Sequence, residues 1–283
     1  MVSPVIQHVD SPLGRWTHSE WRPAHLAGIV ERIGFFAGTL TFPRERVFPD
    51  GRIELNLQLG EPHRLVRAGG SEPFPAACLS GLAPGSFVVE APPGGCRVLG
   101  IRLSPAGAYA LLARPLSELT GITVDLGDLF GSAAAELMER CQEAEDGEEI
   151  LRIAADWIAR RLARSPAADP AIAWTAAEIE RQAGAVSIAG LRERTGLSKT
   201  HLAAVFRDQI GVLPKHYARI HRFRHALDLL RRRELPLVEI ALAAGYYDQP
   251  HLNAEFREMA GMTPGEFLAA AHYPGSVSLA EGA

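Results

Sequence analysis

The chain has 283 residues, of which 47% are hydrophobic and 22% are charged. This length is enough for about two ordinary domains, and the apolar content excludes an intrinsically disordered chain. The net charge of −4 gives no hint of nucleic acid or membrane, and no apolar run approaches the roughly 20 residues that a membrane span needs. Because the N-terminal segment lacks a signal-peptide core, we expect a cytoplasmic protein with no membrane partner.

Charge is unevenly divided along the chain. Residues 1–170 have a net charge of −5, whereas residues 171–272 have +2 and six of the ten histidines. This division suggests two modules with different partners. The three cysteines are an odd number and form no CxxC pair, which argues against both a disulfide framework and a zinc site. We therefore expect buried free thiols and neither a metal nor another cofactor.

The first half of the chain has the pattern of short strands. Residues 1–40 show only weak periodicity. Over residues 53–59, isoleucine and leucine alternate with Glu54, Asn56 and Gln58, which predicts a strand with one face in a core and one in water. Further strands are expected over 78–82, 86–90 and 97–103, between clusters of proline and glycine. Short strands separated by such turns are typical of a small antiparallel sandwich or barrel.

Helical patterns follow over residues 106–114, 126–141 and 148–163, which are rich in alanine, leucine, glutamate and arginine. In the last of these, apolar side chains form one stripe at helical spacing. We interpret the stripe as core, and a dimer surface over residues 126–163 is the alternative. The stripe consists of Ile150, Ile153, Ala154, Trp157, Ile158 and Leu162.

The second half of the chain repeats itself at an offset of 50 residues. Before the turn the offset is 49, so the second copy has one extra residue in its turn. Repetition at this many spaced positions predicts two copies of one structural unit. The matching pairs are His201 and His251, Leu202 and Leu252, Ala204 and Ala254, Phe206 and Phe256, Arg207 and Arg257, Gly211 and Gly261, and Pro214 and Pro264.

Each copy has the signals of a helix, a tight turn and a second helix. In the first copy a helix over 188–194 is closed by Gly196, because glycine readily takes the left-handed conformation at a helix end. Ser198 then suits the N-cap of the next helix, since its hydroxyl accepts a hydrogen bond from an otherwise unpaired N–H. This is the pattern of a helix-turn-helix, whose second helix lies in the major groove of DNA.

The second copy has the same organisation, with a first helix over 238–244, a capping Asp248 and a proline, Pro250, in the first turn of its second helix. Residues 214–233 between the copies suit one long helix with an apolar side and several arginines. A rigid helix there would fix the separation of the two motifs. Two recognition helices on one face could then enter successive major-groove segments about 34 Å apart.

Residues 186–267 resemble the tandem helix-turn-helix domain of AraC-type transcriptional regulators. Residues 1–164 resemble, more weakly, the β-rich sensing or dimerisation domain of that family. The resemblance implies promoter DNA as a partner, RNA polymerase if the protein is an activator, and a small-molecule effector or a homodimer formed through the first domain. The matching residues are Thr195 to Ser198, His201, Leu202, Phe206, Arg207, Gly211 to Pro214, Tyr217, Arg222, Ala226, Leu229, Leu230, Ile240, Ala241, Ala244 to Tyr246, His251, Leu252, Phe256, Arg257, Gly261 to Pro264 and Phe267.

The predicted fold class is α+β. A small, cupin-like β-rich sandwich or barrel with a helical tail is expected over 1–164, and an all-α domain of two helix-turn-helix motifs joined by a long helix over 171–272. Residues 165–170 contain two prolines and no apolar side chain larger than alanine, which is typical of a linker. Residues 273–283 are expected to form a flexible tail.

The resemblance assigns DNA contacts to the two recognition helices. Base contacts are expected from Lys199, Thr200, His201 and Ala203 in the first and from Gln249, His251 and Asn253 in the second. Phosphate contacts are expected from Arg207, Lys215, Arg222 and Arg257. Many family members have a basic or polar side chain where this chain has alanine at 203, 204 and 254, and alanine can only touch a thymine methyl group.

Several of these residues also have simpler interpretations. Arg207 and Arg257 could be partners in surface ion pairs, and the two turn histidines could pack under the turn. His221 and His225 have the i, i+4 spacing of a metal pair, but no third ligand is nearby, so a structural role is favoured.

The alternative function is a ligand-binding or enzymatic cupin-like domain fused to a DNA-binding module. The sequence lacks GxSxG, GxxxxGK[ST], GxGxxG and HExxH motifs, and His63 is the only histidine between His25 and His201. We therefore expect no enzyme. If aromatic side chains of the first domain line an effector pocket, the candidate residues are Trp21, Phe36, Arg52 and Arg102.

Overall fold

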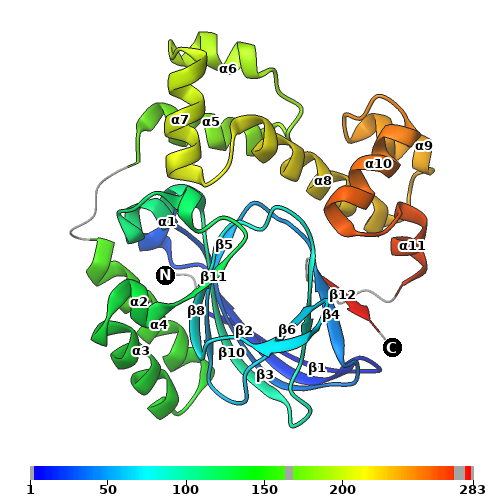
Figure 1. The fold of residues 1–283 in the computed structure, drawn as a ribbon. Helices are drawn as coiled ribbons and strands as arrows, with labels where there is room; N and C mark the ends of the chain where they lie inside the picture. Colours follow the sequence, from blue (N-terminus) through cyan, green and yellow to red (C-terminus); the bar gives the residue numbers. More distant parts are fainter. Residues whose placement is uncertain (1–2, 163–167, 271–277, 282–283) are drawn as a thin grey trace.

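The computed structural model describes residues 3–162, 168–270 and 278–281, which form a β-rich domain and a helical domain packed on it (Figure 1). The strands are β1 Val5–Ser11, β2 Gly14–Trp21, β3 Val30–Leu40, β4 Arg44–Val47, β5 Ile53–Gln58, β6 Arg64–Arg67, β7 Gly70–Pro73, β8 Ala77–Ser80, β9 Phe87–Glu90, β10 Cys96–Leu103, β11 Thr123–Asp125 and β12 Ser278–Glu281. Short 3₁₀ turns, η1 Ala24–Leu26 and η2 Leu116–Glu118, lie between them.

Within the described residues the strands form two antiparallel sheets, which curve toward each other like the wall of a barrel (Figure 1). The seven-stranded sheet has the order β1-β2-β3-β10-β5-β8-β11, and the five-stranded sheet has the order β12-β4-β9-β6-β7. The predicted α+β class with a β-rich barrel at the N-terminus is confirmed. The strands β1 to β3 lie in the stretch for which the sequence predicted no element.

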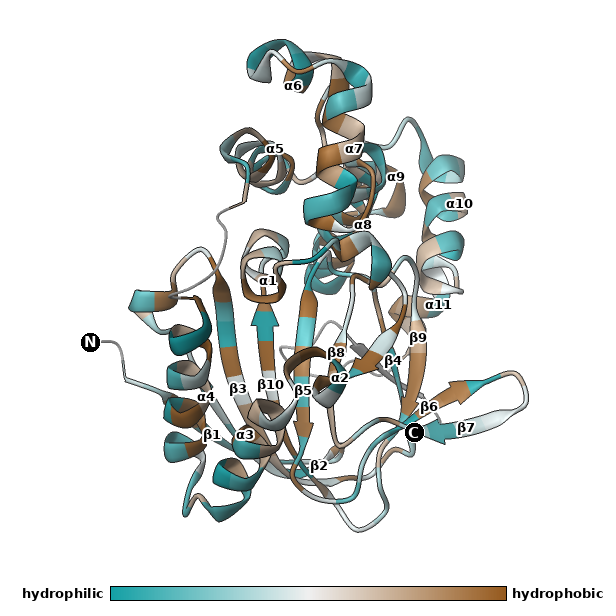
Figure 2. Ribbon diagram, turned by 60° about the vertical axis from the view of Figure 1, so that its left-hand side comes forward, coloured by the Kyte–Doolittle hydropathy of each residue, from teal (hydrophilic) through white to brown (hydrophobic). Residues whose placement is uncertain are grey.

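The two faces of the large sheet have different surroundings, and polar and apolar stretches alternate along β5 and β10 (Figure 2). The apolar side chains of β5, Ile53, Leu55 and Leu57, are almost fully buried in the core. The polar side chains of the same strand line the interior of the barrel instead of facing bulk water. The expected strand is therefore confirmed, but its expected water face is corrected, because the small sheet closes over it.

The helices of the β-rich domain are α1 Pro105–Leu112, α2 Leu126–Phe130, α3 Ser132–Glu143 and α4 Gly147–Leu162. A single helix over 126–141 is wrong, because Gly131 takes a positive φ of 58° and separates α2 from α3. The apolar stripe of α4 is core: Trp157 is 1% exposed, and its indole N–H donates to the carbonyl of Ala133 at 2.9 Å.

The helical domain contains α5 Pro170–Arg181, α6 Ile188–Thr195, α7 Lys199–Ile210, α8 Pro214–Arg232, α9 Leu237–Ala243, α10 Gln249–Ala260 and α11 Pro264–Ala269. The long α8 lies over the barrel, with α6 and α7 at one end and α9 to α11 at the other (Figure 1). Each recognition helix packs on α8 through its repeated phenylalanine. The ring centroids of Phe206 and Tyr217 are 5.8 Å apart, and those of Phe256 and Phe223 are 5.1 Å apart.

The segments expected as linker and tail are only partly described. Residues 165–167 of the linker lie outside the described residues, and Asp169 is the N-cap of α5, where its carboxylate accepts from the N–H of Ala171 at 2.8 Å. In the tail, residues 273–277 and 282–283 lie outside the described residues. Ser278–Glu281 form β12, which pairs antiparallel with β4.

Candidate functional site

The two helix-turn-helix motifs have the caps that the sequence predicts. Gly196 closes α6 with φ of 70°, and the hydroxyl of Ser198 accepts from the N–H of His201 at 3.2 Å to start α7. In the second motif the carboxylate of Asp248 accepts from the N–H of His251 at 2.8 Å to start α10. These bonds satisfy N–H groups that an uncapped helix leaves unpaired, so each recognition helix begins at a defined residue.

The candidate base-contacting residues of α7 lie at its N-terminal end, where Lys199, Thr200 and His201 are exposed and Ala203 is half-buried. In α10 the candidates Gln249 and Asn253 are half-buried. The structure thus brings each set together on one helix, and base contacts by these residues remain predictions.

His251 has a second role inside its own turn. Its Nδ1 accepts from the N–H of Tyr247 at 3.3 Å, and its ring meets that of Tyr246 edge-on at 5.3 Å. The ring therefore helps to shape the turn that presents α10. Tyr247, next in the chain, is 86% exposed.

The candidate phosphate-contacting residues lie in two kinds of surroundings. Arg207, Arg257 and Lys215 are exposed, and among the described residues neither arginine has an ion pair. Arg222 is half-buried, and its guanidinium lies 5.6 Å from the ring of Tyr246. The three exposed cations are the ones most open to a DNA backbone.

The two domains meet at a buried arginine, Arg52, which is 8% exposed. Its Nη2 and Nη1 bind the carboxylate of Glu180 in α5 at 2.8 and 3.1 Å, and Nη1 also donates to the hydroxyl of Tyr217 in α8 at 3.1 Å. It forms an ion pair with Glu31 of β3 as well. The Tyr217 hydroxyl in turn donates to Glu180 at 2.6 Å. One cation thus joins β3 of the barrel to two helices of the other domain.

This arrangement changes the pKa of its members. Burial works to raise the pKa of Glu180, but the hydrogen bonds and charge of Arg52 and the bond from Tyr217 outweigh it, so the pKa lies below its usual value. Burial also raises the pKa of the Tyr217 phenol well above normal. The interface therefore contains an ionised carboxylate, a cation and a neutral phenol.

The loop before β5 lies between this interface and the barrel interior. Asp50 pairs with Arg102 of β10 at 3.1 Å, and its carbonyl oxygen accepts from Arg224 of α8 at 3.0 Å. Gly51 has a φ of 75°, and a Cβ there would lie 2.8 Å from Nε2 of His221, so the backbone approaches α8 closely.

His221 is 6% exposed, and burial lowers its pKa to about 3. Below pH 6.5 the unfolded chain binds a proton at His221 that the folded protein does not bind, so the unfolded state is favoured. The free energy of unfolding is therefore unaffected by this group above pH 6.5 and falls as the pH decreases toward 3. We expect the wild-type free energy of unfolding to fall by about 2 kcal/mol more between pH 7 and pH 5 than that of His221→Gln. Urea denaturation at both pH values measures this difference, and equal pH dependence in the two proteins would contradict it.

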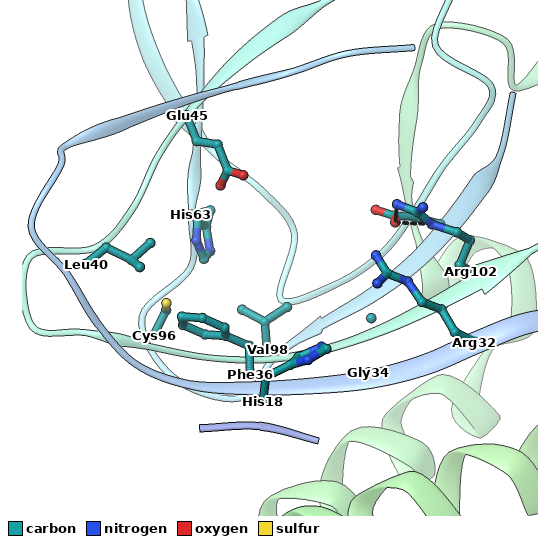
Figure 3. A pocket seen from close by; sticks show the side chains of 12 residues that line it. His18, Arg32, Gly34, Phe36, Leu40, Glu45, His63, Cys96, Val98 and Arg102 are labelled. Atoms are coloured by element: carbon teal, nitrogen blue, oxygen red, sulfur yellow. Dashed lines mark hydrogen bonds and ion pairs between the residues drawn. The ribbon is translucent and has the colours of Figure 1, made fainter. Parts of the chain in front are cut away.

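The barrel interior contains two adjoining cavities of about 260 and 250 Å³. Figure 3 shows the first of them. Arg32 of β3 and Arg102 of β10 lie at one end, and Glu45 of β4 and His63 lie at the other. Phe36 and Val98 supply an apolar patch between them. The side chains shared by both cavities are Arg32, Glu45, Glu54, His63, Val98 and Arg102.

The cavity charges are balanced. Arg102 binds Glu54 at 2.8 Å, and its charge and hydrogen bonds hold the pKa of that carboxyl below normal although burial works to raise it. Arg32 pairs with Glu20 at 3.2 Å. Burial lowers the pKa of His63 to about 4, so this ring is neutral near pH 7. The interior therefore offers hydrogen-bond donors and acceptors with little net charge.

Of the four residues expected in an effector pocket, Phe36 and Arg102 line the cavity. Trp21 lies outside it, with its ring 6.2 Å from that of His25. Arg52 also lies elsewhere, because its guanidinium is held at the domain interface. His18, Glu45 and His63 also line the cavity, and no pattern in the sequence points to them. Only the alternating polar residues of β5 indicate an interior polar face.

Among the described residues, no group of three or more histidine, cysteine, aspartate or glutamate side chains is placed to hold a metal ion. The described cysteines Cys78, Cys96 and Cys141 are buried, and burial raises the pKa of each thiol, to about 12, 11 and 12 respectively. None of the described helices combines the length and the apolar character that a membrane span requires.

Two families match the chain. Residues 191–270 match the helix-turn-helix domain family, and residues 22–125 match a family described as a domain of unknown function, DUF6597. A putative AraC-like transcription regulator of Streptomyces antibioticus is 31% identical over 99 residues, which are 35% of this chain and 29% of that protein. The transcriptional activator RhaR of Enterobacter sp. strain 638 is 36% identical over 72 residues, 25% of this chain and 26% of that protein. The match thus spans less than a third of either relative.

Among solved structures, ToxT of Vibrio cholerae is similar at 13% identity and a TM-score of 0.46, over 83% of this chain and 98% of that chain. The family match covers both motifs whose caps, turn glycines and repeated phenylalanines are described above. The C-terminal helical domain therefore matches the helix-turn-helix family, and it is similar to the corresponding part of an AraC-like transcription regulator and of RhaR.

Proposed function

We propose that the protein is a transcriptional regulator that binds promoter DNA with α7 and α10 and responds to a small molecule in the barrel. The observation that best supports DNA binding is the equivalence of the two recognition helices. Each is capped at its N-terminus, and each has an exposed arginine, Arg207 or Arg257, that forms no ion pair among the described residues. Such cations suit phosphate contacts, which hold a recognition helix in register on the duplex.

We assign the recognition of DNA bases to the N-terminal half of each recognition helix. Lys199 and Thr200 read bases from α7, while Gln249 and Asn253 read bases from α10, because amide and ammonium groups pair with the base edges exposed in the major groove. The alanine at 203 contributes contact with a thymine methyl group. His201 and His251 complete the set.

The ligand of the barrel is a small polar molecule with both hydrogen-bond donors and acceptors. Two arginines, two glutamates and a neutral His63 face one interior, with an apolar patch at Phe36 and Val98. Such a mixture of a few polar groups with apolar walls is typical of small-molecule sites. A regulator of this kind acts in the cytoplasm without catalysis, with RNA polymerase as a partner if it is an activator and a second copy of itself if it dimerises.

The test is selection of genomic DNA fragments by the purified full chain, with and without a metabolite extract. We expect a small set of enriched fragments, whose affinity falls steeply with salt, by about 0.9 logarithmic units per phosphate contact for each tenfold rise. Scrambled DNA should compete poorly. If the protein enriches no fragment under either condition, the proposed DNA binding is wrong. If the same fragments are enriched equally with and without the extract, the proposed response to a small molecule is wrong.

A further inference from the structure

The β-rich domain holds both recognition helices by their C-terminal ends. At the end of α7, the hydroxyl of Thr120 donates to the carbonyl of Gly211 at 2.7 Å. At the end of α10, the N–H of Ser86 donates to the carbonyl of Met259 at 2.8 Å. These two bonds come from different loops of the same domain, one after η2 and one before β9.

The C-cap glycines beside these two bonds occupy equivalent places in the repeat. Gly211 and Gly261 are the C-cap residues of α7 and α10, with φ of 101° and 71°. A Cβ on Gly211 would lie 3.0 Å from the Thr120 hydroxyl, and a Cβ on Gly261 would lie 3.1 Å from a guanidinium nitrogen of Arg46. Each motif therefore places the backbone of its C-cap glycine against a polar side chain of the barrel.

Docking leaves the DNA-facing side of both helices uncovered. Lys199 and Arg207 on α7 and Arg257 on α10 are all exposed in this arrangement. Each recognition helix has 12 residues and is about 18 Å long. Its C-terminal end contacts the barrel, and its N-terminal end is the one proposed to enter the groove. A shift at the held end is then passed on to the end that enters the groove.

We propose that the β-rich domain sets the spacing between the two DNA segments that the protein reads, with Thr120 and the Gly85–Ser86 backbone as spacing-determining positions. This inference rests on the proposed DNA-binding function. The long α8 fixes how far apart the motifs lie along its axis, and the barrel fixes how each one is oriented. One added base pair displaces the second DNA segment by about 3.4 Å and rotates it by about 35°. Two helices that are each fixed by α8 and by the barrel cannot move enough to keep both contacts.

The experiment uses the full chain and the DNA duplex that it selects. Footprinting locates the two contacted segments, and a duplex series adds or removes one or two base pairs between them. The test variant is Thr120→Val with Gly85→Phe. The first change removes the hydroxyl donor, and the second wedges a ring against α10, because a Cβ on Gly85 would already lie 3.8 Å from the carbonyl of Glu258.

A matched control makes the same two changes elsewhere in the domain. Thr123→Val alters a threonine that bonds to Ser80, and Gly94→Phe adds a ring where a Cβ would meet nothing within 4 Å. Both proteins are first checked by thermal unfolding. If the double test variant is unfolded, the single Thr120→Val variant, which keeps the side-chain shape, is measured in its place.

Wild type and control should lose at least about tenfold in affinity for one added base pair. The test variant should lose less than about threefold, or prefer a different spacing. A folded test variant with the wild-type spacing profile overturns the inference, and so does one that binds no duplex of the series. Failure of the wild type to select any duplex is instead a failure of the proposed function.

Discussion

The Arg52→Met variant is expected to have a free energy of unfolding about 3 kcal/mol below that of the wild type. Arg52 is the buried cation between Glu31, Glu180 and the Tyr217 hydroxyl. Methionine fills similar space but leaves the two carboxylates facing each other without a cation. Removal of one partner from a buried charge cluster costs more than the cluster contributes, because the remaining charges are left unpaired in a poorly solvated place.

Urea denaturation at pH 7, followed by tryptophan fluorescence, measures this loss. The control is Arg67→Met, which breaks an exposed pair with Glu72 whose two side chains are 62% and 61% exposed. Exposed pairs contribute little, so the control should lose less than about 1 kcal/mol. Equal losses in the two variants would show that the interface cluster does not stabilise the protein.

Reversal of charge at two equivalent positions, Arg207→Glu with Arg257→Glu, is expected to reduce affinity for the selected duplex on the order of 100-fold. Each arginine is exposed on its recognition helix and is assigned one phosphate. Loss of two hydrogen bonds to a charged group, at about 1.5 kcal/mol each, amounts to this factor before repulsion is added. Nonspecific DNA should be affected as strongly, because phosphates are common to every sequence.

Titration of the duplex at several salt concentrations measures both the affinity and its salt dependence. The log–log slope of affinity against salt should become shallower by about 1.8, or 0.9 for each lost phosphate contact. The control variant, Arg152→Glu with Arg160→Glu, makes the same charge change on exposed residues of α4. If the control loses as much affinity as the test variant, net charge and not local contact explains the effect.

The two helix-turn-helix motifs could be predicted from the sequence because their signals are local. A turn glycine, a capping side chain and a phenylalanine about two turns into the next helix all lie within eight residues of Ser198 or Asp248. Helix ends depend on bonds between near neighbours, so their residues mark them directly. The one long helix between the copies follows for the same reason, and α8 begins at the expected Pro214.

The barrel could be predicted only where one strand face is apolar and the other polar. In β3 both faces are covered: Ile33 packs into the core, while Arg32, Gly34 and Phe36 line the cavity. Since neither face is open to bulk water, the alternation that marks a strand is weak there. The same limit explains β5, whose polar residues match a water-facing pattern although they line the interior of the barrel.

Arg52 could not be assigned because its partners are distant in the sequence. Glu180 lies 128 residues away and Tyr217 lies 165 residues away, in a domain whose placement the sequence does not determine. An arginine in a polar stretch is compatible with an anionic ligand, a surface ion pair or a domain interface. Only the packing of the two domains separates these three interpretations.

The two helix-turn-helix motifs are not identical, because the second turn has one extra residue and side chains at equivalent positions differ. The duplicated domain is therefore asymmetric from one motif to the other. Where the first recognition helix has Lys199, Thr200 and Ala203, the second has Gln249, Pro250 and Asn253 at the matching positions. Under the proposed function, a single chain would read two different sequences in a fixed order and would need no palindrome. Bound to its operator, such a protein has a front and a back along the DNA, so turning a site end for end would change which side of the promoter the β-rich domain faces.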